Sequence, residues 1–178
     1  MNSIKEYLIV DGYNIIGAWP ELQKLRDIRL EDARDRLIDQ LADYQAFSGV
    51  EVYLVFDAHQ VPGLGGKYQQ SKLKIVYTRE KETADELIER LVKELSGRRR
   101  HILVATSDMT EQHVIFGIGA LRLPARELLV KVRESRKEIR RQIAEAKEMT
   151  RNPARNTFDS KLSQEMKQLF EKWRRGNP

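Results

Sequence analysis

The chain has 178 residues, of which 40% are hydrophobic and 33% charged, a composition typical of a globular protein with one sizeable core. It contains no cysteine and three histidines, which excludes disulfides and cysteine nucleophiles and argues against a zinc site built from sulfur and nitrogen. The N-terminus lacks a signal-peptide pattern, and no apolar stretch approaches the about 18 residues of a membrane span, so we expect a cytoplasmic protein with no membrane partner.

The net charge of +5 is unevenly distributed. Residues 126–178 contain 15 Lys and Arg against 8 Asp and Glu, a net charge of +7, whereas residues 1–125 contain 17 against 19, a net charge of −2. An acidic centre with a basic C-terminal third is typical of an enzyme that acts on a polyanion. The alternative, that these cations are only the solvated face of long helices, stays open at this point.

Short apolar strands alternate with helical patterns along the first two thirds of the chain. The expected strands cover residues 7–10, 51–56, 74–77, 102–106 and 120–123. The expected helices between them cover residues 30–47, 85–95 and 110–116. Because the first, second and fourth strands are continuously apolar, the pattern predicts an α/β fold, namely a three-layer α/β/α sandwich with a mainly parallel central sheet.

No strand pattern follows Pro124. Residues 125–149 have the pattern of a long charged helix, Pro153 interrupts it, and residues 158–174 form a last amphipathic pattern. We therefore expect a single domain over residues 1–178, in which residues 125–178 are a basic helical C-terminal extension packed on the rest.

Four acids occupy the positions where a ligand site is expected. Asp11, Asp57 and Asp108 each follow an apolar strand, and Asp85 begins a helix. The carboxyl ends of parallel strands meet at one edge of the sheet, so these carboxylates should converge there. Crowded carboxylates repel one another unless a cation lies among them, and oxygen ligands favour Mg²⁺ or Mn²⁺. Each acid taken alone could be a turn residue or a helix cap, but the four together predict a divalent-metal site.

The local motifs around these acids resemble those of the NYN domain family, a branch of the PIN-like nucleases, and in particular the bacterial YacP-like proteins. The motifs are Asp11-Gly12-Tyr13-Asn14-Ile15-Ile16, Asp57, Thr83-Ala84-Asp85-Glu86 and Thr106-Ser107-Asp108. The resemblance covers about residues 5–170. It implies a PIN-like fold and a metal-dependent endoribonuclease, and the YacP-like branch is associated with ribosomes and cleaves mRNA internally. All four acids match acidic positions of the family, Asn14 matches a polar position, and Thr106 and Ser107 match small hydroxyl residues.

The chemistry of phosphodiester hydrolysis gives these residues separate roles. It needs an activated water and stabilisation of the departing oxygen, both of which one or two divalent ions can supply. We expect Asp11 and Asp108 to ligate metal directly, and Asp85 and Asp57 to bind a second ion or to orient metal-bound water. Asn14, Thr106 and Ser107 would hold these carboxylates and waters in place.

Cations that follow a strand should face the same edge and contact RNA. Arg79, Lys81 and Arg126 meet this condition, whereas Arg98-Arg99-Arg100 precedes a strand and should lie at the opposite edge. The segment 62–72 is too rich in Gly to predict regular structure. It is either a mobile flap that brings Lys67, Tyr68 and Lys72 over the substrate or a plain disordered loop, and the role of its part from Gly63 to Gln70 stays open.

The leading interpretation is a metal-dependent endoribonuclease acting on mRNA at the ribosome. The alternative is a non-catalytic RNA- or ribosome-binding module, against which the complete set of acids argues. A different phosphoryl-transfer enzyme is disfavoured because the chain has no P-loop and no Gly-x-Gly-x-x-Gly motif. No aromatic stacking pair is evident near the acids, so we expect specificity to reside in the partner. The sequence leaves the oligomeric state open.

Overall fold

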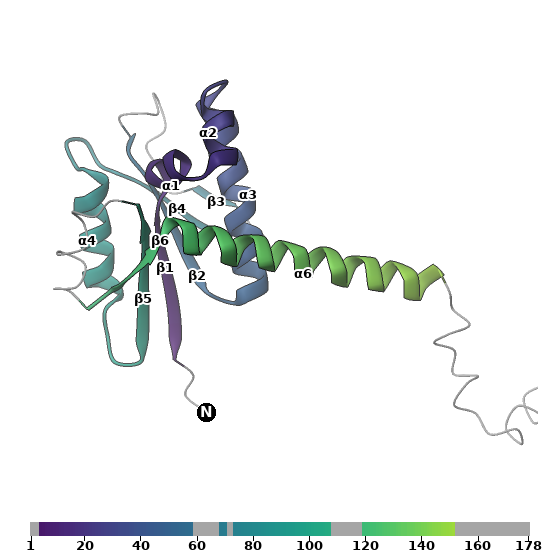
Figure 1. The fold of residues 1–178 in the computed structure, drawn as a ribbon. Coiled ribbons are helices and arrows are strands. Elements are labelled where there is room, and N and C mark those ends of the chain that lie inside the picture. Colours follow the sequence, from purple (N-terminus) through teal and green to yellow (C-terminus); the bar gives the residue numbers. More distant parts are fainter. Residues whose placement is uncertain (1–3, 59–67, 71–72, 108–118, 152–178) are drawn as a thin grey trace, which may run out of the picture. The chain divides into compact units, whose positions relative to one another are not determined.

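The computed structural model describes residues 4–58, 68–70, 73–107 and 119–151 (Figure 1). The chain divides into two compact units, Met1–Arg136 and Lys137–Pro178, and the fold below is that of the first. Two expected helices, at residues 110–116 and 158–174, lie outside the described residues. In the second unit, the described end of α6 carries ion pairs from Arg141 to Glu138 and to Glu145.

A central sheet of six strands in the order β3-β4-β2-β1-β5-β6 organises the first unit. The strands are β1 (Lys5–Asp11), β2 (Glu51–Phe56), β3 (Tyr68–Gln70), β4 (Leu73–Tyr77), β5 (Arg100–Thr106) and β6 (Leu121–Pro124). Every neighbouring pair is parallel except β3 and β4. Helices cover both faces of this sheet (Figure 1). The predicted α/β/α sandwich with a mainly parallel sheet is therefore confirmed.

The expectation of no regular structure in the Gly-rich segment was wrong at its C-terminal end. Residues 68–70 form β3, which pairs antiparallel with β4 through Tyr68 with Ile75 and Gln70 with Leu73. These three residues contain no Gly, and a short edge strand needs only a few partners on β4 to form. Its backbone also satisfies the outer edge of β4, which would otherwise present unpaired amide and carbonyl groups.

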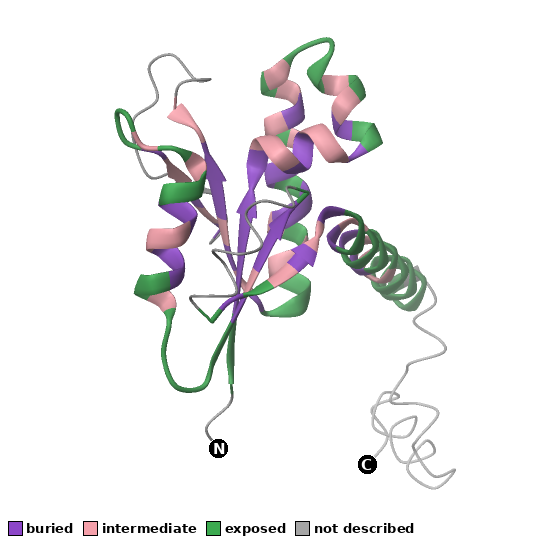
Figure 2. Ribbon diagram, turned by 60° about the vertical axis from the view of Figure 1, so that its left-hand side comes forward, coloured by how far each residue is buried: buried purple, intermediate pink, exposed green. Residues whose placement is uncertain are grey.

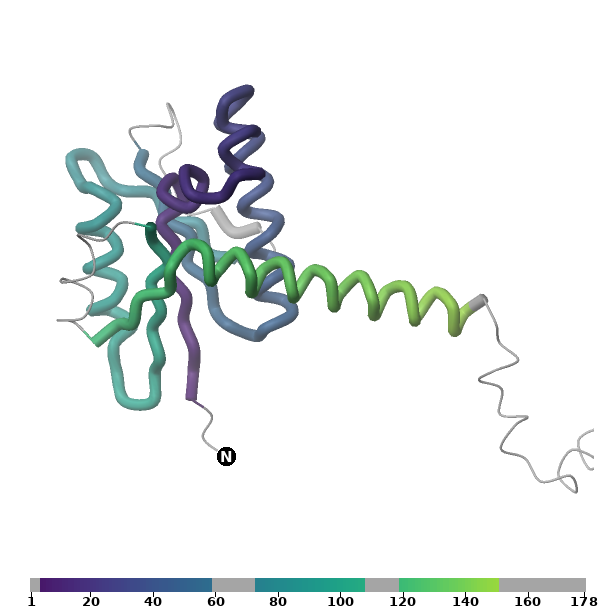
Figure 3. The backbone as a smooth tube through the Cα atoms, in the orientation of Figure 1, coloured from purple at the N-terminus to yellow at the C-terminus, as the bar shows by residue number. Residues whose placement is uncertain are grey.

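The helices are α1 (Gly12–Ala18), α2 (Pro20–Arg26), α3 (Leu30–Ser48), α4 (Ala84–Leu95) and α6 (Ala125–Arg151). The three long ones confirm the expected helices in those regions, whereas α1 and α2 were missed because each has only about two turns and gives little periodicity. The tube in Figure 3 shows α3 and α4 on opposite sides of the sheet. None of the described helices is long and apolar enough to span a membrane.

Alternation along the strands builds two cores, one on each face of the sheet. Leu8 and Val10 of β1 pack in the core that contains α1, α2, α3 and the start of α6. Tyr7 and Ile9 pack in the other core, against the buried stripe of α4. Figure 2 shows the strands as the buried centre of the unit, with exposed residues on the outer sides of the helices. Because successive side chains point to opposite faces, the same alternation fixes where the residues at the strand ends point.

Glu51 at the amino end of β2 lies between two lysines. It forms ion pairs with Lys5, at 2.8 Å, and with Lys74. Partial burial by itself would raise the pKa of Glu51, but the hydrogen bonds from Lys5 and Lys74 outweigh it and lower the pKa from 4.5 to about 2. These ion pairs of Glu51 therefore link β1 and β4 to β2 at the end of the sheet opposite the candidate site.

Replacing Glu51 with Gln should reduce the acid sensitivity of the fold. Because the pKa is lower in the folded than in the unfolded chain, the stabilisation is complete above pH 4.5 and is lost as the pH falls toward 2. We expect Glu51→Gln to lower the free energy of unfolding by about 1–3 kcal/mol near neutral pH, allowing for the exposed lysine partners. Guanidinium unfolding at about pH 7 and about pH 3 measures this, since the deficit should shrink at the lower pH.

Glu89→Gln is the matched control, because Glu89 pairs with Lys93 one turn away on the surface of α4. Exposed pairs of this kind contribute little, so this variant should be nearly neutral at both pH values. An equal effect of the two substitutions would contradict the role given to Glu51.

Candidate active site at the carboxyl rim of the sheet

The carboxyl ends of four neighbouring strands form one rim, which we call the carboxyl rim. Its described members are Asp11, Asp57, Thr78, Thr106 and Ser107. The register places Asp11 beside Val55 of β2 and Val10 beside Ala105 of β5. Asp57 and Thr78 lie two positions further along than Asp11, directly after the paired residues Phe56 and Tyr77. In Figure 1 this is the end of β1 from which α1 leaves.

Three of these side chains belong to the face that α4 covers. Ile9, Val55 and Val104 pack in the core beside α4. Asp11, Asp57 and Thr106 follow each of them by two positions, and side chains two apart in a strand share a face. The ladder continues past β2, since the Thr78 amide donates to the Phe56 carbonyl at 3.0 Å. Two carboxylates and a buried hydroxyl are thus directed to the same side of the rim.

Asp11 is both the last residue of β1 and the cap of α1. The residue is 8% exposed, and its Oδ1 accepts a hydrogen bond from the Asn14 amide at 3.3 Å. Asp11 therefore does cap a helix, and this hydrogen bond fixes the orientation of its carboxylate at the rim.

Asn14 links α1 to the segment that follows β5. Its Oδ1 accepts hydrogen bonds from the Ser107 amide, at 2.6 Å, and from the Ser107 hydroxyl. Ser107 directly precedes Asp108, which lies outside the described residues. Asn14 therefore holds the backbone of Ser107, the residue before Asp108. Thr106, the residue before Ser107, is fully buried.

Asp57 is held by Thr78, a residue that the sequence reasoning missed. The Thr78 hydroxyl donates to Asp57 Oδ1 at 3.3 Å and accepts from the Ala58 amide at 2.9 Å. Its position in the sequence could have identified it, because Thr78 directly follows β4 just as Asp57 directly follows β2. Thr78 became a rim residue only because β4 lies beside β2.

The three acids near the start of α4 have different surroundings. Glu86 completes a capping box with Thr83, with hydrogen bonds of 2.9 and 3.2 Å. Glu82 accepts from the Arg79 amide at 2.8 Å and pairs with Arg90 at 2.8 Å; despite opposing partial burial, these contacts lower the pKa of Glu82. Asp85 is exposed and forms no hydrogen bond or ion pair with a described residue. Glu82 and Glu86 thus have structural partners, and Asp85 remains available for a ligand.

The structure describes three of the five cations that are predicted to contact RNA. Arg79 and Lys81 are exposed in the turn from β4 to α4, and Arg126 is exposed in the first turn of α6. Lys67 and Lys72 lie outside the described residues. Arg98 and Arg99 are exposed at the other end of the sheet, where the Arg99 carbonyl accepts from the amide of Lys5 at the start of β1. Arg79, Lys81 and Arg126 thus lie at the same end of the sheet as the rim acids, as the strand directions predict.

The donors at the rim are carboxylate and hydroxyl oxygens, which are the ligands that Mg²⁺ and Mn²⁺ prefer. In the described part of the chain, no group of three or more Asp, Glu or His residues lies close enough to hold a metal ion. Asp11 and Asp57 supply two carboxylates with fixed orientation, and the third strand-end acid, Asp108, is outside that part. The chemical type of the site therefore fits a hard divalent cation.

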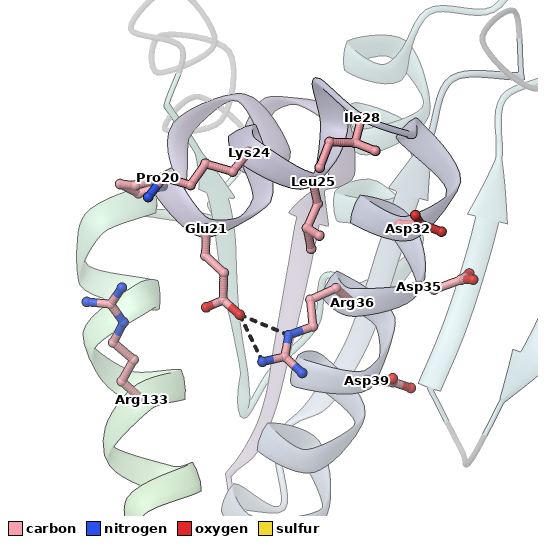
Figure 4. Close-up of a pocket in the computed structure, with 10 residues that line it drawn as sticks. All are labelled: Pro20, Glu21, Lys24, Leu25, Ile28, Asp32, Asp35, Arg36, Asp39 and Arg133. Carbon is pink, nitrogen blue, oxygen red and sulfur yellow. Dashed lines mark hydrogen bonds and ion pairs between the residues drawn. The ribbon is translucent and has the colours of Figure 1, made fainter.

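A separate hollow of about 820 Å³ opens on the outer surface of α2 and α3 (Figure 4). Glu21 and Arg36 pair across it at 2.8 Å, and Asp32, Asp35 and Asp39 follow one side of α3. None of its lining residues ends a strand. Its acids and cations are interspersed, so the rim has the stronger chemical claim to be the functional site.

Comparison with known proteins identifies the family. A model of the YacP-like NYN domain matches residues 8–175. The chain belongs to the YacP-like NYN domain family. It is 47% identical over 172 residues to the Bacillus subtilis (strain 168) protein described as "Uncharacterized protein YacP", covering 97% of this chain and 98% of that protein. NYN domains are PIN-like and typically nucleases, which confirms the resemblance seen in the motifs.

Two crystal structures of Rae1 (YacP) from Bacillus subtilis share the fold. One has a TM-score of 0.73 at 48% identity and covers 96% of this chain and 95% of that chain. The other, of a point mutant of Rae1, has a TM-score of 0.72 at 45% identity and covers 80% of this chain and 84% of that chain. The similarity thus extends well beyond the four acids and their motifs.

Gly12, between Asp11 and Tyr13, is a packing requirement of the rim. A Cβ at this position would lie 2.3 Å from Cε1 of Phe56 and 2.8 Å from the Val55 carbonyl oxygen. Gly12→Ala should therefore displace the Phe56 ring and lower the free energy of unfolding by about 1–3 kcal/mol. Chemical unfolding monitored by circular dichroism measures the loss.

Gly17→Ala provides the control within the same helix. The nearest atom to its added Cβ is Arg26 Nη1 at 3.8 Å, which is ordinary contact. This variant should be neutral or gain up to about 1 kcal/mol, because Ala restricts the unfolded chain and favours the helix. Equal stability of the two variants would show that Phe56 accommodates the methyl group without cost.

Proposed function

We propose that the chain is a divalent-metal-dependent endoribonuclease that cleaves mRNA phosphodiester bonds in association with the ribosome in the cytoplasm. The observation that carries the proposal is the pair of oriented carboxylates, Asp11 and Asp57, at the carboxyl rim of a YacP-like NYN domain. Ligands of open α/β sheets bind beyond this edge of the strands. Membership of the NYN domain family, whose members are typically nucleases, supports this class of activity.

The four acids have separate proposed roles. Asp11, Asp85 and Asp108 would hold Mg²⁺ or Mn²⁺, with Asp57 as a fourth catalytic carboxylate. The bound metal would supply an activated water and neutralise charge on the leaving oxygen. Asn14 and Ser107 would keep Asp108 in position, Thr78 would keep Asp57 in position, and the buried Thr106 would support the floor of the site.

Cations would hold the RNA on either side of these acids. Arg79 and Lys81 follow β4, and Arg126 follows β6, so all three lie toward the end of the sheet that carries the rim. Lys67 and Lys72 would add phosphate contacts. Residues 125–178, which we propose to be a basic extension of a single domain, would provide longer-range attraction to ribosomal RNA.

The Asp11→Asn and Asp85→Asn variants test the catalytic assignment. Asn remains a good helix cap at position 11, and Asp85 is exposed, so both variants should fold as the parent does. Each should lower the rate of RNA cleavage by more than about 100-fold, the upper range for losing a residue that only supports a metal ligand. Asp39→Asn, which removes the same charge from the outer surface of α3, should cleave normally.

The same assay, run on oligoribonucleotides and on translating ribosomes, also separates an enzyme from a binding module. EDTA should abolish cleavage, and added Mg²⁺ or Mn²⁺ should restore it. RNA or ribosome binding without cleavage under any metal condition would favour the non-catalytic alternative. Normal cleavage by Asp85→Asn would remove that residue from the mechanism.

The Arg79→Gln/Lys81→Asn variant tests the phosphate contacts. Lys81 has a φ of 65°, a conformation that Asn tolerates better than most residues, so the turn should be preserved. Loss of two cations at the rim should weaken RNA binding and reduce the salt dependence of log Kd by about 0.7 per lost contact on single strands. Binding titrations at several salt concentrations give this slope.

Arg98→Gln/Arg99→Asn is a closely matched control at the other end of the sheet. Arg99 also has a φ of 65°, so both variants lose two charges and place Asn in the same backbone conformation. The control should leave the binding of a short RNA unchanged. Equal losses in the two variants would mean that net charge, and not position at the rim, governs binding.

A further inference from the structure

Three aromatic rings form a cluster at the carboxyl rim, which corrects the expectation that the site lacks an aromatic pair. Phe56 ends β2 and Tyr77 ends β4, and their rings stack with centroids 6.0 Å apart and an interplanar angle of 29°. Tyr13, two residues after Asp11, places its ring 5.0 Å from that of Phe56. The residues are far apart in sequence, and the adjacency of β2 and β4 together with the direction of α1 brings them together.

The middle ring is fully buried and the outer two are partly exposed. Phe56 is fully buried, and its ring lies against the backbone of Gly12, where no side chain would fit. Tyr13 and Tyr77 are half-buried on either side of it. A rigid buried ring thus supports two partly exposed phenols that require little further ordering to bind a ligand.

A cation is held beside this cluster. Arg34 of α3 donates from Nη1 to the Tyr13 hydroxyl over 3.5 Å, and its side chain is only 12% exposed. Its carboxylate partner among the described residues is the exposed Glu31, at 3.8 Å, a loose pair. Among the described residues, the guanidinium is therefore held by an aromatic hydroxyl and by one loose carboxylate pair.

Tyr13 also interacts with the catalytic side of the rim. Burial raises the pKa of Tyr13, the hydrogen bond from Arg34 opposes this, and the charges of Tyr77 and Asp57 raise it further. Tyr13 therefore lies beside Arg34, through the 3.5 Å hydrogen bond, and beside the ring of Phe56.

We infer that Tyr13 and Tyr77 form a stacking subsite for one unpaired base of single-stranded RNA, with Arg34 contacting the phosphate of the same nucleotide. This inference rests on the proposed function and names the element that holds the substrate. Aromatic rings beside an incompletely paired arginine and a set of cations are the features that recognise unstacked nucleotides. Stacking accepts any base, so this subsite selects unpaired RNA without reading sequence.

The test measures the binding of a short oligoribonucleotide to Asp85→Asn protein, so that the RNA is not consumed. Each position of the RNA is replaced in turn by an abasic nucleotide, and Kd is measured by fluorescence anisotropy. Tyr13→Leu and Tyr77→Leu should each weaken binding of the intact RNA by about 5-fold or more. One abasic position should weaken binding to the parent by a similar factor and cause no further loss in the two Leu variants.

Two other substitutions separate stacking from general damage. Tyr13→Phe retains the ring and should bind RNA nearly as the parent does. Tyr44→Leu removes another half-buried tyrosine of the same core, near the last turn of α3, where Gln45 accepts from the amide of Val52 near the start of β2. It should leave RNA affinity unchanged. Equal affinities of Tyr13→Leu, Tyr77→Leu and Tyr44→Leu for the RNA would overturn the inference.

A second measurement covers the case in which the Leu variants do not fold. Ultraviolet crosslinking of RNA to otherwise unsubstituted Asp85→Asn protein, followed by mass spectrometry, should attach nucleotides to Tyr13 or Tyr77. Crosslinks confined to other residues would overturn the subsite. The fate of the proposed function is separate: absence of cleavage by the unsubstituted protein under every metal condition would refute the nuclease assignment and leave the stacking results standing.

Discussion

The contact of Gly12 with Phe56 is the constraint on which the rim depends. Because Gly12 has no Cβ, α1 can leave β1 directly over the end of β2, with the Phe56 ring against its backbone. This sharp exit makes Asp11 both the end of a strand and the cap of a helix. A larger residue would move the start of α1, and with it each side chain that α1 brings to the rim.

The positions of three side chains follow from that one turn. Asp11 points to the face covered by α4, Tyr13 contacts the aromatic cluster on the other face, and Asn14 reaches the segment after β5. The neighbouring strands are held by equally local links, such as that of Thr78 to Asp57. The carboxylates at the rim are therefore held by local hydrogen bonds and by close packing around the strand ends, which is how a site can keep repelling carboxylates in place.

The sequence predicted the features that repeat along the chain and missed those that depend on strand neighbours. Apolar runs and helical periodicity identified the long elements, whereas α1, α2 and β3 are too short to show a period. The rule that ligands bind beyond the strand ends led to Asp11 and Asp57. It did not reveal Thr78 or the contact of Phe56 with Tyr77, because these require knowing that β4 lies next to β2.

The end of β2 relates the two parts of the proposed site to each other. Phe56 and Asp57 are consecutive, so their side chains leave the strand toward opposite faces. Phe56 supports Tyr13 and Tyr77 on one face, while Asp57 and Asp11 occupy the other. A nucleotide lying across the end of this strand would place its base on the tyrosines and the adjoining phosphodiester near the carboxylates. Binding through the base would then supply the positioning that the hydrolytic step requires, since orientation of the reacting groups contributes a large part of catalysis.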